Sequence, residues 1–169
     1  MTSAQLLADA FGRIQGIVHR VVGGLTQEQL AFRVDDEANT IGWLVWHLTR
    51  VQDDHVADAA GTQQVWITQG WAERFALPFS VEETGFGQTG EQVAAVRVES
   101  GGLLTGYHDA VYERTIDYVS ALTDDDLARI VDPGWDPPVT LGIRLVSVIG
   151  DDLQHAGQAA FVRGVVERR

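Results

Sequence analysis

Apolar and polar residues alternate with helical spacing along the first part of the chain. Between residues 3 and 22 an apolar side chain recurs every three or four positions, which predicts a helix with one buried stripe. Gly23 and Gly24 follow directly and are expected to end this helix. The stripe consists of Leu6, Leu7, Ala10, Phe11, Ile14, Ile17, Val18 and Val21.

The same spacing predicts three more long helices. Thr40 is a favourable N-cap, so we expect a second helix from residue 41 to a stop at Gly61. A third is expected over about residues 103–122 and a fourth over about residues 140–166. The core stripe of the second helix is Ile41, Leu44, Val45, Leu48 and Val51, and that of the third is Leu103, Leu104, Tyr107, Val111, Ile116 and Val119.

The segment between the second and third helices has a different character. Residues 61–101 contain many glycines, Pro78 and two tryptophans. Such a composition is typical of irregular structure. We therefore expect a long crossover with one short helical turn over residues 90–98.

A short internal similarity indicates how the helices are arranged. GLTQEQL (24–30) follows the first helix and ALTDDDL (121–127) follows the third, and each precedes a polar loop and a long helix. Thr26 and Thr123 are expected to cap short helical turns. Two such halves joined by one crossover predict an all-α fold, a four-helix bundle in a single domain over residues 1–169.

Composition and charge narrow the functions to consider. The 169 residues carry a net charge of −12, which disfavours binding to nucleic acid or to an anionic membrane. The chain has no cysteine, so a metal ion would need histidine and carboxylate ligands. No segment reaches the roughly 18 apolar residues of a membrane span, and we expect a cytoplasmic protein.

A polar stretch, DDLQHAGQ (151–158), interrupts the apolar pattern of the fourth helix. Asp151 and His155 are four residues apart and therefore lie on one helix face, where together they could bind one metal ion. A buried carboxylate is costly unless it is paired or coordinates a cation. The apolar residues expected around this pair are Leu141, Val148, Phe161 and Val162.

His47 is a similar polar residue in apolar surroundings, within LVWHL of the second helix. If the two halves of the chain correspond, His47 packs near Asp151 and His155. Two imidazoles and one carboxylate would leave open positions for water or substrate, as in catalytic divalent sites.

Several alternatives remain open from the residues alone. His47 could be a core histidine, and Asp151 with His155 a plain ion pair in a bundle that binds a small apolar ligand without catalysis. Asp54 and His55 follow His47 by about two turns, roughly 11 Å, which is too far for one ion. We interpret His55 as a pocket or rim residue. GFGQTG (85–90) lacks the preceding strand that a dinucleotide fingerprint requires.

These residues resemble the DinB-like superfamily of four-helix-bundle metalloproteins. The resemblance rests on HL in the second helix, on an acid four residues before a histidine, and on HAGQ (155–158) in the fourth. That superfamily includes the metal-binding domain of mycothiol-dependent maleylpyruvate isomerases. The resemblance implies a divalent metal held by His47, Asp151 and His155. The isomerases' separate C-terminal domain has no counterpart here, so isomerisation itself is not supported.

This resemblance implies a metal-dependent transferase that uses a low-molecular-weight thiol such as mycothiol as cosubstrate. We expect zinc, with nickel or iron as alternatives, and a metal-bound thiolate as the nucleophile. The small-molecule electrophile would lie beside the ion. The expected pocket residues are His55, Trp66, Trp71 and Arg74. A metal-dependent hydrolase is the alternative enzyme, and an exposed face of the bundle is compatible with a homodimer.

Overall fold

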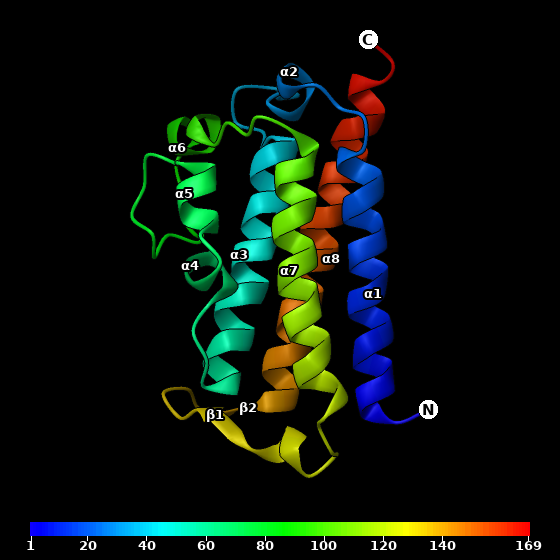
Figure 1. Cartoon of the computed structure of the whole chain (residues 1–169), viewed down its shortest axis with the longest axis vertical. Coiled ribbons are helices and arrows are strands. Elements are labelled where there is room, and N and C mark those ends of the chain that lie inside the picture. Colours follow the sequence, from blue (N-terminus) through cyan, green and yellow to red (C-terminus); the bar gives the residue numbers. More distant parts are fainter.

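Four long helices form the body of the protein in a computed structural model that describes residues 1–169 (Figure 1). α3 packs against α7 and α8, and α1 packs against the same two helices. The chain passes from α3 to α7 through a long crossover. The predicted all-α four-helix bundle is therefore confirmed. The four helices are α1 (Ser3–Val22), α3 (Ile41–Ala60), α7 (Gly101–Ser120) and α8 (Leu141–Val166).

Threonine caps begin three of these helices, as predicted for Thr40. The hydroxyls of Thr2, Thr40 and Thr140 each accept a hydrogen bond from a backbone N–H in the first turn of their helix. α3 ends at Gly61, whose φ of 67° is left-handed. Only α7 departs from its expected bounds, because it begins and ends two residues early.

Thr26 caps a short helical turn as predicted, and the Thr123 hydroxyl accepts from the Asp126 N–H at 3.3 Å, although the N-cap of the 3₁₀ helix that follows is Asp125. Thr26 makes a capping box at the start of α2 (Gln27–Leu30). The Thr123 N–H donates to the Asp126 carboxylate at 2.8 Å, ahead of the 3₁₀ helix η1 (Asp126–Ala128). The following loop differs from expectation, because it contains an antiparallel hairpin of β1 (Ile130–Asp132) and β2 (Val139–Thr140). Strands of three and two residues are too short to produce a periodic pattern.

The crossover contains three short helices instead of one. α6 (Gly90–Ala95) is the expected turn, whereas α4 (Val65–Thr68) and α5 (Trp71–Phe75) were not predicted. Helices of four or five residues are not stable alone. Here the carboxylate of Asp53 in α3 accepts hydrogen bonds from the Val65 and Trp66 N–H groups at 2.9 and 2.7 Å, which holds α4 against the bundle.

Asp53 belongs to a buried polar group that we call the arginine cluster. Tyr107 of α7 donates to Asp53 at 2.8 Å, and the fully buried Arg50 donates to Gln64 at 2.7 Å and to the Glu83 carbonyl at 3.1 Å. Asp53 is buried although it is charged, because its carboxylate binds the crossover. The arginine cluster consists of Arg50, Asp53, Gln64 and Tyr107.

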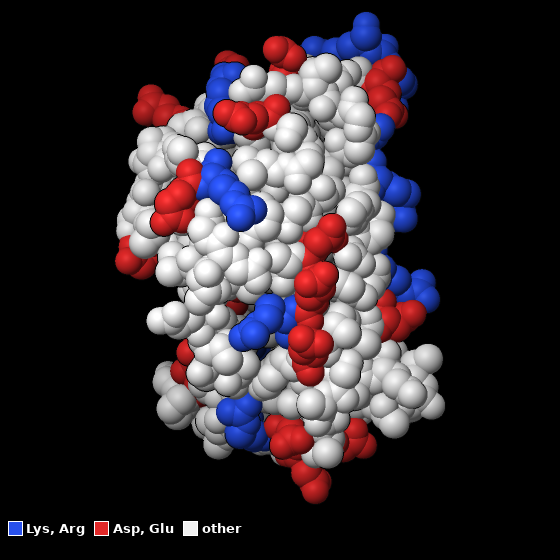
Figure 2. Space-filling model, in the orientation of Figure 1, with Lys and Arg blue, Asp and Glu red and all other residues white.

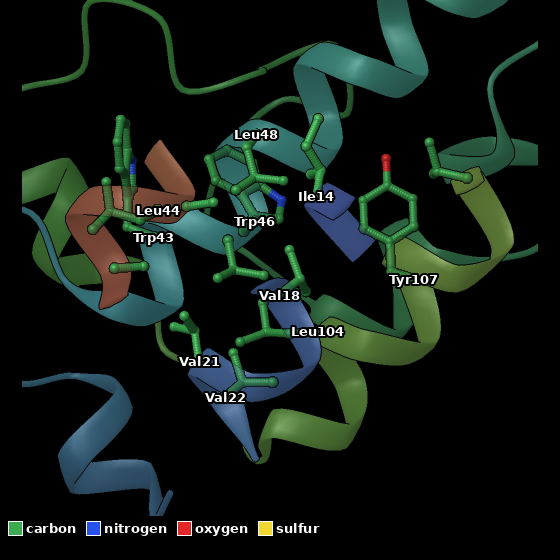
Figure 3. Close-up of a cluster of buried hydrophobic side chains, with 14 of the residues drawn as sticks. Ile14, Val18, Val21, Val22, Trp43, Leu44, Trp46, Leu48, Leu104 and Tyr107 are labelled. Atoms are coloured by element: carbon green, nitrogen blue, oxygen red, sulfur yellow. The ribbon is translucent and has the colours of Figure 1, made fainter. Parts of the chain in front are cut away.

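The hydrophobic core lies between the four helices. Side chains from α1, α3 and α7 converge in it, among them Ile14, Trp46 and Leu104 (Figure 3). Every residue of α3 from 41 to 50 is buried, so this helix is the central element. Acidic and basic side chains are interspersed over the face that Figure 2 shows. None of the helices combines the length and the apolar content that a membrane span requires.

Candidate metal centre

α3 and α8 bring His47, Asp151 and His155 together, and we call these three residues the metal cluster. Each offers one ligand atom, and these atoms lie within 4.8 Å of one another. His155 Nε2 is 3.6 Å from Asp151 Oδ1, as their spacing of four residues on one helix allows. The imidazole centroids of His47 and His155 are 4.8 Å apart. The grouping anticipated from the sequence is thus present in the fold.

Each imidazole of the metal cluster is oriented by one hydrogen bond. His47 Nδ1 lies 2.5 Å from the carbonyl oxygen of Thr84. A carbonyl only accepts, so Nδ1 carries the proton and the Nε2 lone pair is free. His155 Nδ1 lies 2.9 Å from Gln158 Oε1, which fixes the same tautomer. Such outer contacts are typical of histidines that bind metals.

Burial and charge in the metal cluster suit a divalent cation. His47 is buried, and burial lowers its pKa below the usual value, so its imidazole is neutral at pH 7 and able to donate a lone pair. Asp151 Oδ2 is shielded from solvent and has no hydrogen-bond partner within the protein. A cation bound by both imidazoles and this carboxylate would supply the missing partner.

The end of the crossover packs directly on His47. Gly85 has a φ of 98°, and a Cβ there would lie 2.9 Å from His47 Nδ1 and 3.0 Å from the Trp46 ring. Only glycine allows the backbone to approach so closely. Trp43 stacks on His47 at 4.5 Å and donates from Nε1 to Gln88 Oε1 at 2.8 Å. The crossover and α3 therefore fix the position of this imidazole together.

A cavity of about 440 Å³ opens beside the metal cluster and includes His47 and Asp151 in its wall. It provides space for a small molecule next to the ligand atoms. Phe86, which is 90% exposed, lies at its edge between two glycines with positive φ. We call this cavity the cluster pocket. The other residues that line it are Val51, Asp54, His55, Thr84, Ser147 and Val148.

His55 lies in this pocket, as expected from the sequence. Its Nδ1 is 3.1 Å from Nη1 of Arg144. Because a guanidinium only donates, Nδ1 must accept and the proton is on Nε2. Burial, and then the charge of Arg144, lower the pKa of His55 below its usual value. His55 is thus a neutral side chain with an N–H group to offer.

The structure does not bring Trp66, Trp71 and Arg74 to the pocket. The two tryptophans are buried in the core, where each packs against Tyr107, and Arg74 stacks on Trp71 at 4.4 Å. Aromatic side chains in a crossover can equally cover the bundle, and these do. Phe161 was also expected to pack around the metal pair, but it is 65% exposed, because it lies on the outer face of α8.

Some residues of the site were not identified from the sequence. Gln158 was noticed as part of HAGQ, but its contact with His155 was not anticipated. Thr84 acts through its backbone oxygen, which has no residue-specific signal. Phe86 could have been suspected from its position between two glycines in GFG.

Asp152, next to the candidate ligand Asp151, faces the interior of the bundle. It is fully buried, and neither carboxylate oxygen has a hydrogen-bond partner within the protein. Burial raises its pKa well above the usual value, and the neighbouring Asp151 acts in the same direction. Burial therefore favours the protonated form of Asp152, which does not belong to the metal cluster.

Comparisons with known proteins agree with this geometry. A solved structure, the "conserved protein of locus from Enterococcus faecalis", is similar to the whole chain with a TM-score of 0.92 and 29% identity, over 100% of this chain and 99% of that one. A search of curated proteins found no match. The model of a DinB-like family, mycothiol S-transferase, matches residues 6–167. Since this match spans nearly all of the sequence, the chain belongs to the mycothiol S-transferase family.

Proposed function

We propose that this protein is a metal-dependent S-transferase that joins a low-molecular-weight thiol of the mycothiol type to a small electrophile. The observation that supports it best is the metal cluster, whose three ligand atoms lie within 4.8 Å of one another beside the cluster pocket. The family match supports the class of reaction. Because the chain has no cysteine, a thiol nucleophile has to come from a cosubstrate.

His47, Asp151 and His155 would hold a divalent ion, with zinc as the first candidate and nickel or iron as alternatives. When bound, such an ion lowers the pKa of a coordinated thiol. The protein orients the ligands before binding, since Thr84 and Gln158 fix the two imidazoles. The reaction forms one C–S bond, the displaced group leaves with its electron pair, and the thiol proton passes to solvent.

The cluster pocket gives the electrophile two kinds of contact. His55 presents its Nε2–H to an acceptor on either substrate, because Arg144 occupies Nδ1. Phe86 offers an apolar surface at the edge of the pocket. We propose that these two residues, rather than Trp66, Trp71 and Arg74, contact the substrates.

Metal analysis tests the site directly. Protein purified without an affinity-tag metal and then exposed to zinc should retain about one equivalent after dialysis. Asp151→Asn should retain less than about a tenth, because the amide keeps the shape but loses the negative charge. Asp54→Asn, which changes a carboxylate at the pocket wall outside the metal cluster, is the matched control and should bind normally. Equal metal content in all three proteins would contradict the site.

The reaction is tested by following free mycothiol in the presence of a model electrophile. Loss of thiol that needs both protein and metal supports the transferase. Product that forms without added thiol would instead identify a metal-dependent hydrolase, and no turnover by metal-loaded protein over a panel of electrophiles would favour a non-catalytic bundle.

A further inference from the structure

The outer face of α8 carries no charge. Between residues 141 and 161 every exposed side chain is apolar, small or uncharged, although the chain as a whole has a net charge of −12. Four bulky apolar side chains on this face are 43–65% exposed. We call it the α8 outer face. Its exposed residues are Ile143, Val146, Ser147, Leu153, Gln154, Gly157, Gln158, Ala160 and Phe161.

The other helices differ from α8 in this respect. The exposed positions of α1 include Asp9, Arg13 and Arg20, and those of α7 include Glu113 and Asp117. α3 has almost no exposed residues. α8 already buries one apolar stripe in the core, so its outer face makes it apolar on two sides. A helix that is apolar all round is normally covered on both sides.

The α8 outer face also has a heptad pattern. Apolar or small residues follow one another at alternating steps of three and four from residue 143 to residue 160, which is the spacing of a seam between two packed helices. No other atom lies within 4 Å of a Cβ placed at Gly150 or Gly157, so both positions are open to a second chain. The seam consists of Ile143, Val146, Gly150, Leu153, Gly157 and Ala160.

We propose that the α8 outer face is the interface of a two-fold homodimer in which the two α8 helices pack antiparallel. The order of large and small residues supports this partner, because in an antiparallel seam each large residue meets a small one. A parallel seam would instead place large on large and glycine on glycine. The antiparallel partners are Ile143 with Ala160, Val146 with Gly157 and Gly150 with Leu153, each from opposite subunits.

Area and charge are both compatible with a second copy. If a bulky side chain offers about 200 Å² when fully exposed, the four on this face expose about 400 Å² per subunit, as much as the largest apolar patch of many proteins. At about 60% apolar area, a dimer covering them would bury roughly 1,300 Å² in total, which is a standard interface. Two chains of charge −12 repel each other least where the facing surfaces are uncharged.

Oligomeric state tests the proposal. The purified protein should have twice the 18.5 kDa mass of one chain in sedimentation or light scattering at micromolar concentration. Leu153→Arg should weaken dimerisation at least about 100-fold, because it places a charge in the centre of the seam. Leu153 is 43% exposed in one subunit, so helicity and melting should persist when the variant is monomeric. Leu6→Arg, at a 59% exposed position on α1, should remain dimeric.

The register can be tested with cysteines, because the natural chain has none. Val146→Cys subunits mixed with Gly157→Cys subunits should form a disulfide between the two variants. Neither variant should cross-link to itself, since the two copies of position 146 would be about 16 Å apart along the seam. A monomer at all concentrations, a Leu153→Arg dimer, or efficient self-linking of Val146→Cys would overturn the proposal. None of these results depends on metal or thiol.

Discussion

The arginine cluster and the metal cluster both extend from α3, yet their hydrogen bonding differs. In the first, Asp53 accepts three hydrogen bonds and Arg50 donates to several oxygens, so the protein satisfies its own charges. In the second, His47 and His155 each make one hydrogen bond, through Nδ1, and Asp151 Oδ2 has no partner. The polar groups of the arginine cluster are paired within the protein, whereas the metal cluster has atoms that are free to bind a ligand.

This difference separates a structural role from a binding role. A buried charge that is fully paired within the protein stabilises one arrangement of the chain and has little capacity for a ligand. A buried group with fixed orientation and a free lone pair is prepared for a ligand that the chain does not contain. The arginine cluster accordingly joins the crossover to the bundle, whereas the metal cluster borders a cavity.

Removing Asp53 should have the largest effect on stability. Asp53→Ala leaves Arg50 buried without its nearest carboxylate and frees the Val65 and Trp66 N–H groups. We expect the free energy of unfolding to fall by about 3–5 kcal/mol, measured by urea denaturation. Asp54→Ala, at a 40% exposed side chain, should cost less than about 1 kcal/mol. Similar losses in the two variants would remove the distinction between the clusters.

His108 extends the comparison to a buried group without any partner. Neither ring nitrogen is hydrogen-bonded within the protein, and burial lowers its pKa to about 4, although Asp109 opposes and His19 assists the shift. The unfolded chain binds this proton at a pKa near 6.5, so the folded state loses stability as pH falls from about 6.5 to about 4.

His108→Leu should therefore reduce acid sensitivity. Between pH 7 and pH 4.5 the variant should lose about 2–3 kcal/mol less stability than the natural protein, in urea denaturation at both pH values. At pH 7 itself the two should agree within about 1 kcal/mol, because Leu fills a similar volume and needs no hydrogen bond. Parallel pH profiles would show that this imidazole finds a partner for its proton.

A smaller effect should come from Gln158, which orients a ligand without being one. Gln158→Leu removes the acceptor from His155 Nδ1 and should weaken zinc binding about 10- to 100-fold in competition with a chelator. The melting temperature of metal-free protein should hardly change, because this side chain makes no other hydrogen bond and a leucine suits the uncharged α8 outer face. Gln154→Leu, also on the exposed side of α8, is the matched control and should bind zinc normally.

The smallest effect is expected at Phe86. Phe86→Ala should raise KM about fivefold for an apolar electrophile, which corresponds to about 1 kcal/mol of lost contact, and leave kcat unchanged. A small polar electrophile should be converted equally well by both proteins. Stability should not change, because Phe86 is 90% exposed. An equal loss for both electrophiles would mean that Phe86 shapes the loop instead of contacting the substrate.

The long helices were predictable because their signals are local. Capping threonines and regular apolar spacing lie within each segment and agree with one another, as at Thr40 and Gly61 around α3. The short helices and strands were not predictable, because the contacts that stabilise them come from residues distant in sequence. α4 depends on a carboxylate twelve residues earlier, and the β1–β2 hairpin has too few residues to show a pattern.

The same limit applies to the site. His47, Asp151 and His155 could be grouped because two of them share a helix face and the third stands out in apolar surroundings. The pocket could not be derived, since it depends on where the crossover lies. Trp66 and Trp71 turn inward toward Tyr107, and Phe86 is held outward by the conformation of its neighbouring glycines.

The contact between Gly85 and His47 links metal affinity to the order of the crossover. Thr84 can fix the imidazole only while the crossover lies against it, so a chain whose crossover is detached keeps the Trp43 stacking but loses the hydrogen bond that orients Nε2 toward the metal site. The apparent dissociation constant for the metal ion then equals the intrinsic constant divided by the fraction of molecules whose crossover is docked. A titration with a chelator would therefore report how much of the crossover is docked. A substrate that favours the docked crossover would increase the affinity for metal, and bound metal would increase the affinity for that substrate by the same factor.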